Sequence, residues 1–238
     1  MKLTPYLFIL FATFGITFSS CGQKVSGNGD VVQEDRPVEA FSSIDIGGVL
    51  NVFLEQGDTE SVRVEADENL LDLIITENRG NTLVVKLKRG IDVKKAKKKN
   101  VYITLRSIDA LEVGGVVNVK STTPLVADDF DLDIGGVSNT DLELRCDRLT
   151  AKADMVGNLT LRGVVREADI KNGGVGSLKA FDLEVDRLTI KNSGVGSAEV
   201  QANEEISIKS SGVGSVRYKG DAVVKELSTS GVGSVKKI

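Results

Sequence analysis

The sequence lacks two residue types entirely and is poor in two others. It has no histidine and no tryptophan, and only two cysteines and three prolines among 238 residues. Without histidine, Ser-His-Asp and Cys-His nucleophiles and imidazole-ligated metal sites are excluded. The net charge of −4 gives no overall basic bias toward nucleic acid. The chain is nevertheless 41% apolar and 27% charged, which is typical of a folded protein.

The N-terminal residues have the pattern of an export signal. Lys2 precedes an apolar run from Tyr6 to Phe18 that is too short to span a membrane. The run ends in Phe18-Ser19-Ser20-Cys21, which resembles the lipobox of bacterial lipoproteins, with Phe18 where leucine is usual. We therefore expect residues 1–20 to be a lipoprotein signal peptide and Cys21 to carry the lipid anchor. An ordinary secretion signal with an unrelated cysteine is the alternative.

Residues 21–36 contain glycine, serine and glutamine with little pattern, which is typical of a tether between an anchor and a folded part. The second cysteine, Cys146, lies in a strand-like stretch. We expect it to be a small buried apolar residue rather than a reactive thiol.

The C-terminal half of the chain is built from a repeat, which contains a glycine-rich corner. Equivalent segments are Ile170–Ser177, Ile190–Ser197, Ile208–Ser215 and Leu227–Ser234. Aligned on the central valine, the series extends back to Val116 in steps of 18 to 21 residues, and Val49 fits one longer step earlier. Apolar and polar side chains alternate around the corner, which indicates half-buried strands.

A unit of this length cannot bury its own apolar face, whereas stacked units can. We therefore predict an all-β fold in which residues 107–238 form a right-handed β-helix-like solenoid with rungs of about 19 residues. A leucine-rich repeat is the alternative, but the units contain no helical segment. Residues 37–106 break the register and alternate like strands, with a hairpin signal at 77–82. They are expected to form a β-rich N-terminal subdomain.

One polar position recurs two residues after each aligned valine. Stacked rungs would place these side chains about 4.8 Å apart, so that an amide donates to one neighbour and accepts from the other. We interpret the column as a structural ladder, with a row for ligand recognition as the alternative. Its members are Asn51, Asn118, Asn139, Asn158, Ser177, Ser197, Ser215 and Ser234.

Acidic side chains are the only candidates for catalysis. Asp128, Asp129, Asp131 and Asp133 cluster in the sequence, and Asp128, Asp147, Asp186 and Glu204 share a second repeat position. A polysaccharide-cleaving enzyme would need such carboxylates to converge on a groove. We interpret them as solvent-facing residues, and no spacing resembles a calcium loop. The chain is therefore expected to be a non-enzyme without metal or cofactor.

Basic side chains concentrate in one segment of this acidic protein. The segment is a candidate contact for anionic envelope material, with a solvated loop as the alternative. The lysines at its centre are Lys94, Lys95, Lys97, Lys98 and Lys99. The export signal and the absence of interleaved aromatic residues disfavour nucleic acid as a partner.

Several segments, in this order, are similar to those of a known family. They are Arg36-Pro37-Val38 before Phe41-Ser42-Ser43-Ile44, then Gly48-Val49-Leu50-Asn51-Val52, and Val64-Glu65-Ala66-Asp67-Glu68-Asn69-Leu70-Leu71. Over residues 36–235 the sequence resembles the Bacteroidetes family described as putative auto-transporter adhesin, head GIN domain. The resemblance implies an all-β, β-helix-like fold, an envelope location and a binding role, but no known reaction.

These observations predict a lipid-anchored cell-envelope protein that acts as a non-catalytic binding, adhesion or structural module. The outer membrane is the expected location, with its periplasmic and surface faces both open. A polysaccharide-binding or polysaccharide-cleaving β-helix protein is the alternative. The expected partners are the membrane, through the anchor, and an envelope glycan or protein. Because little chain follows the last regular repeat, we also expect a homo-oligomer that covers the final rung.

Overall fold

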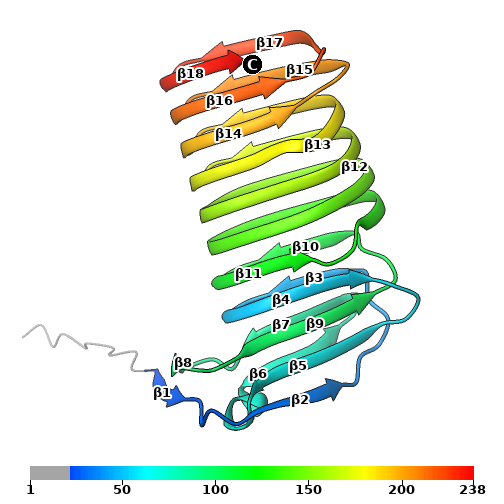
Figure 1. The fold of residues 1–238 in the computed structure, drawn as a ribbon, viewed down its shortest axis with the longest axis vertical. Helices are drawn as coiled ribbons and strands as arrows, with labels where there is room; N and C mark the ends of the chain where they lie inside the picture. Colours follow the sequence, from blue (N-terminus) through cyan, green and yellow to red (C-terminus); the bar gives the residue numbers. More distant parts are fainter. Residues whose placement is uncertain (1–21) are drawn as a thin grey trace, which may run out of the picture.

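The computed structural model describes residues 22–238, so the predicted signal peptide and Cys21 lie outside the described residues. The described chain is all-β apart from one short 3-10 helix, which confirms the all-β part of the expected fold. Its strands wind in successive turns that stack along the long axis of an elongated molecule (Figure 1). In residues 22–238 no helix is long and apolar enough to cross a membrane.

The elements are numbered in chain order, and Figure 1 colours them from blue near the N-terminus to red at the C-terminus. The N-terminal elements are β1 (Gln23–Ser26), β2 (Val31–Arg36), β3 (Ser43–Ile46), β4 (Val49–Gln56), β5 (Ser61–Asp67), the 3-10 helix η1 (Glu68–Leu73), β6 (Ile74–Arg79), β7 (Thr82–Leu87), β8 (Ile91–Lys95) and β9 (Lys99–Leu105). The later elements are β10 (Ala110–Val113), β11 (Val116–Ser121), β12 (Leu125–Asn172), β13 (Val175–Asn192), β14 (Val195–Gln201), β15 (Glu205–Ser210), β16 (Val213–Lys219), β17 (Val223–Thr229) and β18 (Val232–Lys237).

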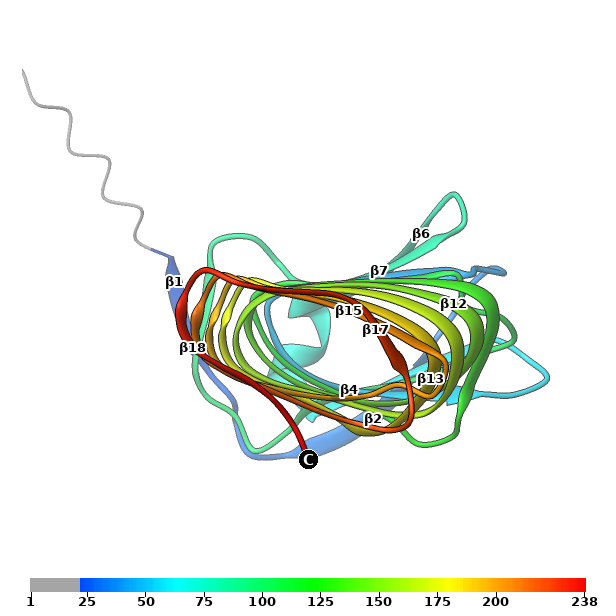
Figure 2. The same cartoon turned by 90° about the horizontal axis from the view of Figure 1, so that it is seen from above.

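Successive turns pair in parallel within one 16-stranded sheet, and their register follows the valine alignment of the sequence. Val116 lies beside Val49 on one neighbouring strand and beside Val137 on the other. The later turns continue this register as far as Val232. Viewed along the stack, the turns outline an oval (Figure 2). Residues at the same repeat position therefore stand in columns along the molecule.

The interior of the winding is filled by equivalent apolar residues from successive turns. The buried members of one such column are Ile44, Leu111, Leu132, Ala151, Ile170, Ile190 and Ile208. Alternation along each strand turns these side chains inward and their neighbours outward. Complete burial of one large aliphatic side chain stabilises a fold by roughly 1.5–3 kcal/mol. Burial of such columns thus stabilises stacked turns where a single turn would leave the same side chains exposed.

The N-terminal part contains the first turn and an insertion. The strands β3 and β4 pair in parallel with β10 and β11, so they belong to the stack. The insertion that follows adds an antiparallel β6–β7 hairpin, and it includes β5 and β9, which pair antiparallel with each other. Its 3-10 helix η1 lies inside the oval outline in Figure 2, and Leu70 of this helix is fully buried. This insertion accounts for the long step between Val49 and Val116.

The described part of segment 21–36 differs from the expected tether, because two of its stretches are strands. The strand β1 pairs in parallel with β8, and β2 pairs antiparallel with β5. Between them, the Asn28 backbone N–H donates to Asn69 Oδ1, and the Gly29 N–H donates to Asp67 Oδ2. Their partners lie about forty residues downstream, so composition alone could not indicate that these residues are held in place.

The C-terminal end of the stack is uncovered. Every residue of β17 is exposed. Leu227, which occupies the inward column, is 47% exposed, and Val232 in β18 is 75% exposed. The two ends of the winding therefore differ, since η1 packs at the N-terminal end and the described chain supplies no such element at the other.

Candidate functional site

The asparagine half of the predicted polar column is joined by side-chain hydrogen bonds. The amide of Asn118 donates to Asn51 at 2.9 Å, and Asn139 donates to Asn118 at 3.3 Å. Asn158 continues the chain by donating to Asn139 at 3.0 Å. Asn51 in turn donates to Asn100 at 3.0 Å. Asn100 lies in β9, outside the repeat, so the alignment of valines gave no signal for it.

The serine half of the column keeps the register but makes weaker side-chain contacts. The hydroxyl of Ser197 donates to that of Ser177 at 3.1 Å, and the backbones of Ser215 and Ser234 pair in the same column. The residue before each serine is glycine because a side chain would not fit there. At Gly196, φ is +138°, and an added Cβ would lie 1.8 Å from the carbonyl oxygen of Gly176. The corner therefore brings the backbones of successive turns into close contact.

The basic segment at 94–99 is tied to neighbouring acids rather than free. Lys94 forms an ion pair with Asp92, and Lys98 forms one with Glu65 at 3.1 Å. The Lys97 ammonium contacts the backbone oxygen of Gly29 at 3.4 Å. Lys99 is partly buried, which lowers its pKa, whereas Lys95 is exposed. The structure thus gathers these lysines beside the insertion and neutralises part of their charge.

Two buried acids hold this segment against the insertion. Asp67 is 1% exposed, and its carboxylate accepts the backbone N–H groups of Lys97 at 2.9 Å and Lys98 at 3.1 Å. Burial alone would raise the pKa of Asp67, but these N–H groups and that of Gly29 outweigh it and place the pKa below its ordinary value. Glu65 follows the same pattern, because bonds from Asn100, Lys98, Tyr102 and Gln33 lower its pKa against burial.

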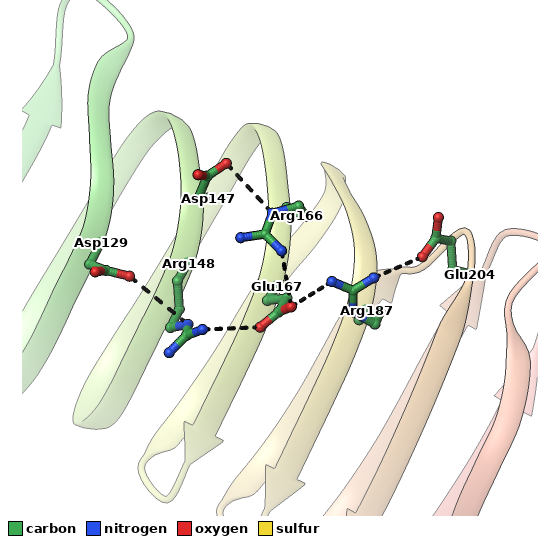
Figure 3. A network of polar contacts seen from close by, with 7 residues as sticks. All are labelled: Asp129, Asp147, Arg148, Arg166, Glu167, Arg187 and Glu204. Carbon is green, nitrogen blue, oxygen red and sulfur yellow. Dashed lines mark hydrogen bonds and ion pairs between the residues drawn. The ribbon is translucent and has the colours of Figure 1, made fainter.

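The four acidic side chains that share one repeat position do not converge on a groove. They are Asp128, Asp147, Asp186 and Glu204. Figure 3 shows acids and arginines from successive turns joined along one flank. Glu167 contacts Arg148, Arg166 and Arg187. The outer partners of these arginines are Asp129, Asp147 and Glu204. Within residues 22–238, no ion pair involves Asp128 or Asp186. Of the four predicted carboxylates, Asp147 and Glu204 therefore neutralise guanidinium groups on separate turns.

The acidic residues that cluster in the sequence between 128 and 133 are partly brought together in the structure. Asp128, Asp129 and Asp131 line a groove that also contains Arg106, whereas Asp133 pairs with Lys152 at 3.4 Å. In the described part of the chain, no group of three or more acidic or cysteine side chains is placed to hold a metal ion. Cys146 is partly buried and forms no disulfide within residues 22–238, and burial, with Asp147 and Asp129 nearby, raises the pKa of its thiol to about 12.

A basic groove lies on the same winding at a position that sequence reasoning did not single out. Four lysines from β12, β13 and β15 line it together with serines, and its volume is about 540 Å³. We call it the lysine groove. Its lysines are Lys152, Lys171, Lys191 and Lys209, and its serines include Ser193, Ser211 and Ser230. The lysines stand four residues before the aligned valines, so the repeat itself carried a signal for them.

The aligned valines form an exposed apolar ridge, which we call the valine ridge. One valine from each turn projects outward at the glycine corner and is stacked on the next. Their exposed fractions are 38% for Val49, 50% for Val116, 47% for Val137, 51% for Val156, 52% for Val175, 50% for Val195, 51% for Val213 and 75% for Val232. The ridge runs the length of the stack.

Solved structures share this fold. A putative adhesin from Bacteroides fragilis NCTC 9343 is 29% identical, with a TM-score of 0.85 over 90% of this chain and 100% of that one. A putative adhesin from Parabacteroides distasonis ATCC 8503 is 25% identical, with a TM-score of 0.69 over 91% and 100%. A putative lipid binding protein from the same organism is 21% identical, with a TM-score of 0.71 over 90% and 100%, and shares the fold.

No curated protein matches the chain. The family model described as putative auto-transporter adhesin, head GIN domain, matches residues 40–222, which is most of the sequence and includes the insertion, the winding as far as β16 and the four lysines of the groove. The resemblance noted from the sequence is confirmed, and the chain belongs to this family.

Proposed function

We propose that the chain is a lipid-anchored protein of the cell envelope that acts as a non-catalytic binding module. Its family and its export-signal pattern support an envelope location, and Cys21 is the proposed lipid-bearing residue. The proposed location is the outer membrane, on either face. In this proposal the stacked turns form a right-handed β-helix-like solenoid with rungs of about 19 residues. The parallel register between aligned valines supports this geometry.

The valine ridge is the observation that carries the binding role. An apolar stripe that continues over several turns is costly to leave in water, and large exposed apolar patches mark interaction surfaces. The ridge is regular and lies outside the core, so the fold does not need valine there for packing. We infer that an extended envelope partner lies along it. The ladder of asparagines and serines serves in this proposal to hold the turns in register beside the ridge.

Binding to envelope material tests this function. The full chain in a non-ionic detergent is immobilised and exposed to isolated cell-envelope fragments. The triple variant Val175→Thr, Val195→Thr and Val213→Thr keeps β-branched side chains but makes the ridge polar. The matched control changes Val126, Val164 and Val223, which lie outside the ridge and are at least as exposed, to threonine. We expect the ridge variant alone to lose binding. Equal retention by the two variants would contradict the role of the ridge.

Three further roles concern other parts of the surface. The alternative of a polysaccharide-cleaving protein would need paired carboxylates, whereas those on the flank in Figure 3 are spread over arginine ion pairs. The basic segment at 94–99 remains a proposed contact for anionic surfaces, mainly through the exposed Lys95. A second copy of the chain is a proposed partner at the uncovered C-terminal end.

A further inference from the structure

The lysine groove contains charge that the protein does not neutralise. Lys152 lies between Asp133 and Asp154, and Lys209 pairs with Glu226. Across residues 22–238, by contrast, no carboxylate forms an ion pair with Lys171 or Lys191. These two lysines are directly paired in register on neighbouring strands. Like charges stacked in this way destabilise a sheet. Two central cations of the groove are thus left without a counter-charge.

The fold does not require lysine at this repeat position. In the preceding turns the same column contains Asp45, Glu112 and Asp133. The following turn has Ser228 beside Lys209. The position faces outward in all of these turns, so either sign of charge fits the sheet. A run of lysines on four successive turns is therefore a local feature of the groove, and its electrostatic cost needs a different explanation from packing.

Hydroxyl groups line the groove beside the lysines. The backbone N–H groups of Ser193, Ser211 and Ser230 are bonded to the preceding turns. In the described chain their side-chain hydroxyls make no hydrogen bond, so they are free to donate to a ligand and to accept from it. The groove thus presents a row of cations beside a row of hydroxyls, both repeated at the spacing of adjacent strands, which is about 4.8 Å.

We propose that the lysine groove binds a linear glycan that carries carboxylate or sulfate groups and lies along the long axis of the stack. Successive anionic groups would meet Lys171 and Lys191, and sugar hydroxyls would meet the serines. An extended sugar chain advances per residue by a distance comparable to the spacing between turns, so one ligand unit faces one turn. This inference rests on the proposed binding function and gives it a second surface, which contains none of the ridge valines, together with the ligand class of that surface.

A concave, hydroxyl-lined site favours a glycan over a lipid surface. The lysines lie within a groove of about 540 Å³ rather than on a projecting tip. No aromatic side chain lines this groove, which removes the stacking platform that single-stranded nucleic acid uses. Lysine acts as a point charge without the bidentate geometry of arginine. Binding is therefore expected to weaken strongly as salt increases.

Binding of the detergent-solubilised full chain to defined polymers tests the proposal. The probes are polygalacturonate, dextran sulfate, neutral dextran and phosphatidylglycerol vesicles. The groove variant is Lys171→Gln with Lys191→Gln. The control is Lys120→Gln with Lys179→Gln, which removes the same charge from exposed positions outside the groove. We expect the groove variant to lose affinity for the acidic glycans by about tenfold or more at low salt, and the control to behave as wild type.

A charge-preserving variant and thermal unfolding separate binding from folding. Lys171→Arg with Lys191→Arg should restore binding of the acidic glycans, and all variants should unfold at similar temperatures. Three results overturn the proposal: no binding of either acidic glycan by the wild type, equal losses in the groove and control variants, or groove-dependent binding of vesicles alone. Wild-type protein that binds envelope fragments but neither acidic glycan contradicts this inference only. Failure to bind envelope fragments as well contradicts the proposed function.

Discussion

Asn118 donates its side-chain amide to Oδ1 of Asn51 at 2.9 Å, although 67 residues separate the two along the chain. The bond joins the turn that precedes the insertion to the turn that follows it. The same two strands pair in parallel with no shift in register. The stack therefore continues across the insertion as if the intervening residues were absent, and the amide column marks that continuity on the surface.

Replacing Asn118 with alanine should destabilise the fold by about 1 kcal/mol, because the residue makes two amide bonds at an exposed position. The midpoint of urea unfolding measures this change. Ser215→Ala is the control and should shift the midpoint less, since a hydroxyl makes fewer bonds than an amide. An unchanged midpoint for Asn118→Ala would show that the column contributes nothing to stability.

Asp67→Asn should cost about 2 kcal/mol, because hydrogen bonds to a charged acceptor are stronger and an amide NH2 would face the Gly29 N–H. The pKa of Asp67 is lowered in the folded state. Its contribution is therefore complete above the unfolded pKa of about 3.9 and is lost as pH falls through the lower folded value. As the pH is lowered from 7 to 2, the urea midpoint of Asp67→Asn should therefore fall less than that of the wild type. The exposed Asp72→Asn should retain the wild-type profile.

Gly196→Ala should destabilise the protein by about 3 kcal/mol or more, because its Cβ would collide with the Gly176 carbonyl at a φ that disfavours other residues. Gly80 also has positive φ, but an added Cβ would meet nothing within 4 Å. Gly80→Ala should therefore cost only about 1–2 kcal/mol. Calorimetric unfolding temperatures compare the two, and equal losses would mean that the close approach of the turns is unimportant.

Cys21→Ala should leave the protein unprocessed or released from membranes, because the proposed acyl chains have no other attachment site in the signal pattern. Membrane fractionation and metabolic labelling with a fatty acid measure this. Ser20→Ala keeps a small residue before the cysteine and should remain lipidated. A Cys21→Ala protein that is cleaved and still sediments with membranes would show that the anchor lies elsewhere.

The uncovered C-terminal end should mediate self-association, because Leu227 is half exposed over the interior of the last turn and β17 has an unpaired edge. Sedimentation velocity should show a larger species as the protein concentration rises. Leu227→Lys should abolish it, whereas Val126→Lys, a similarly exposed change on the side of the stack, should not. A wild type that is monomeric at every concentration is the contrary result.

The repeat made much of the fold predictable, since equivalent residues that stack in space also recur in sequence. The columns that contain Val116 and Ile170 could be recognised in the sequence for this reason. The insertion has no such period, and its strands are held by partners far away in the chain. The bonds from Lys97 and Lys98 to Asp67 are one example, and they explain why the basic segment is less free than its sequence suggests.

The candidate site was predictable only in part. Asn100 joins the amide column from β9, which pairs in parallel with β4 but lies in the insertion and has no valine at the aligned position, so the alignment could not identify it. Lys171 and Lys191 do recur at one repeat position, yet their importance depends on the missing acids around them, and that is a property of the folded surface. Ion pairs such as Arg187 with Glu204 likewise depend on which turn lies next to which.

The parallel register of the turns has a consequence for how such a gene can change. Because Gly176, Gly196 and Gly214 meet corner to corner, duplication or loss of one complete unit would join the same surfaces that are joined now. The protein would become longer or shorter by one step, and its exposed columns would keep their chemistry. A partial unit would instead displace every later side chain from its neighbour. Unequal recombination could thus change the length of the stack while the contacts between neighbouring turns stay the same.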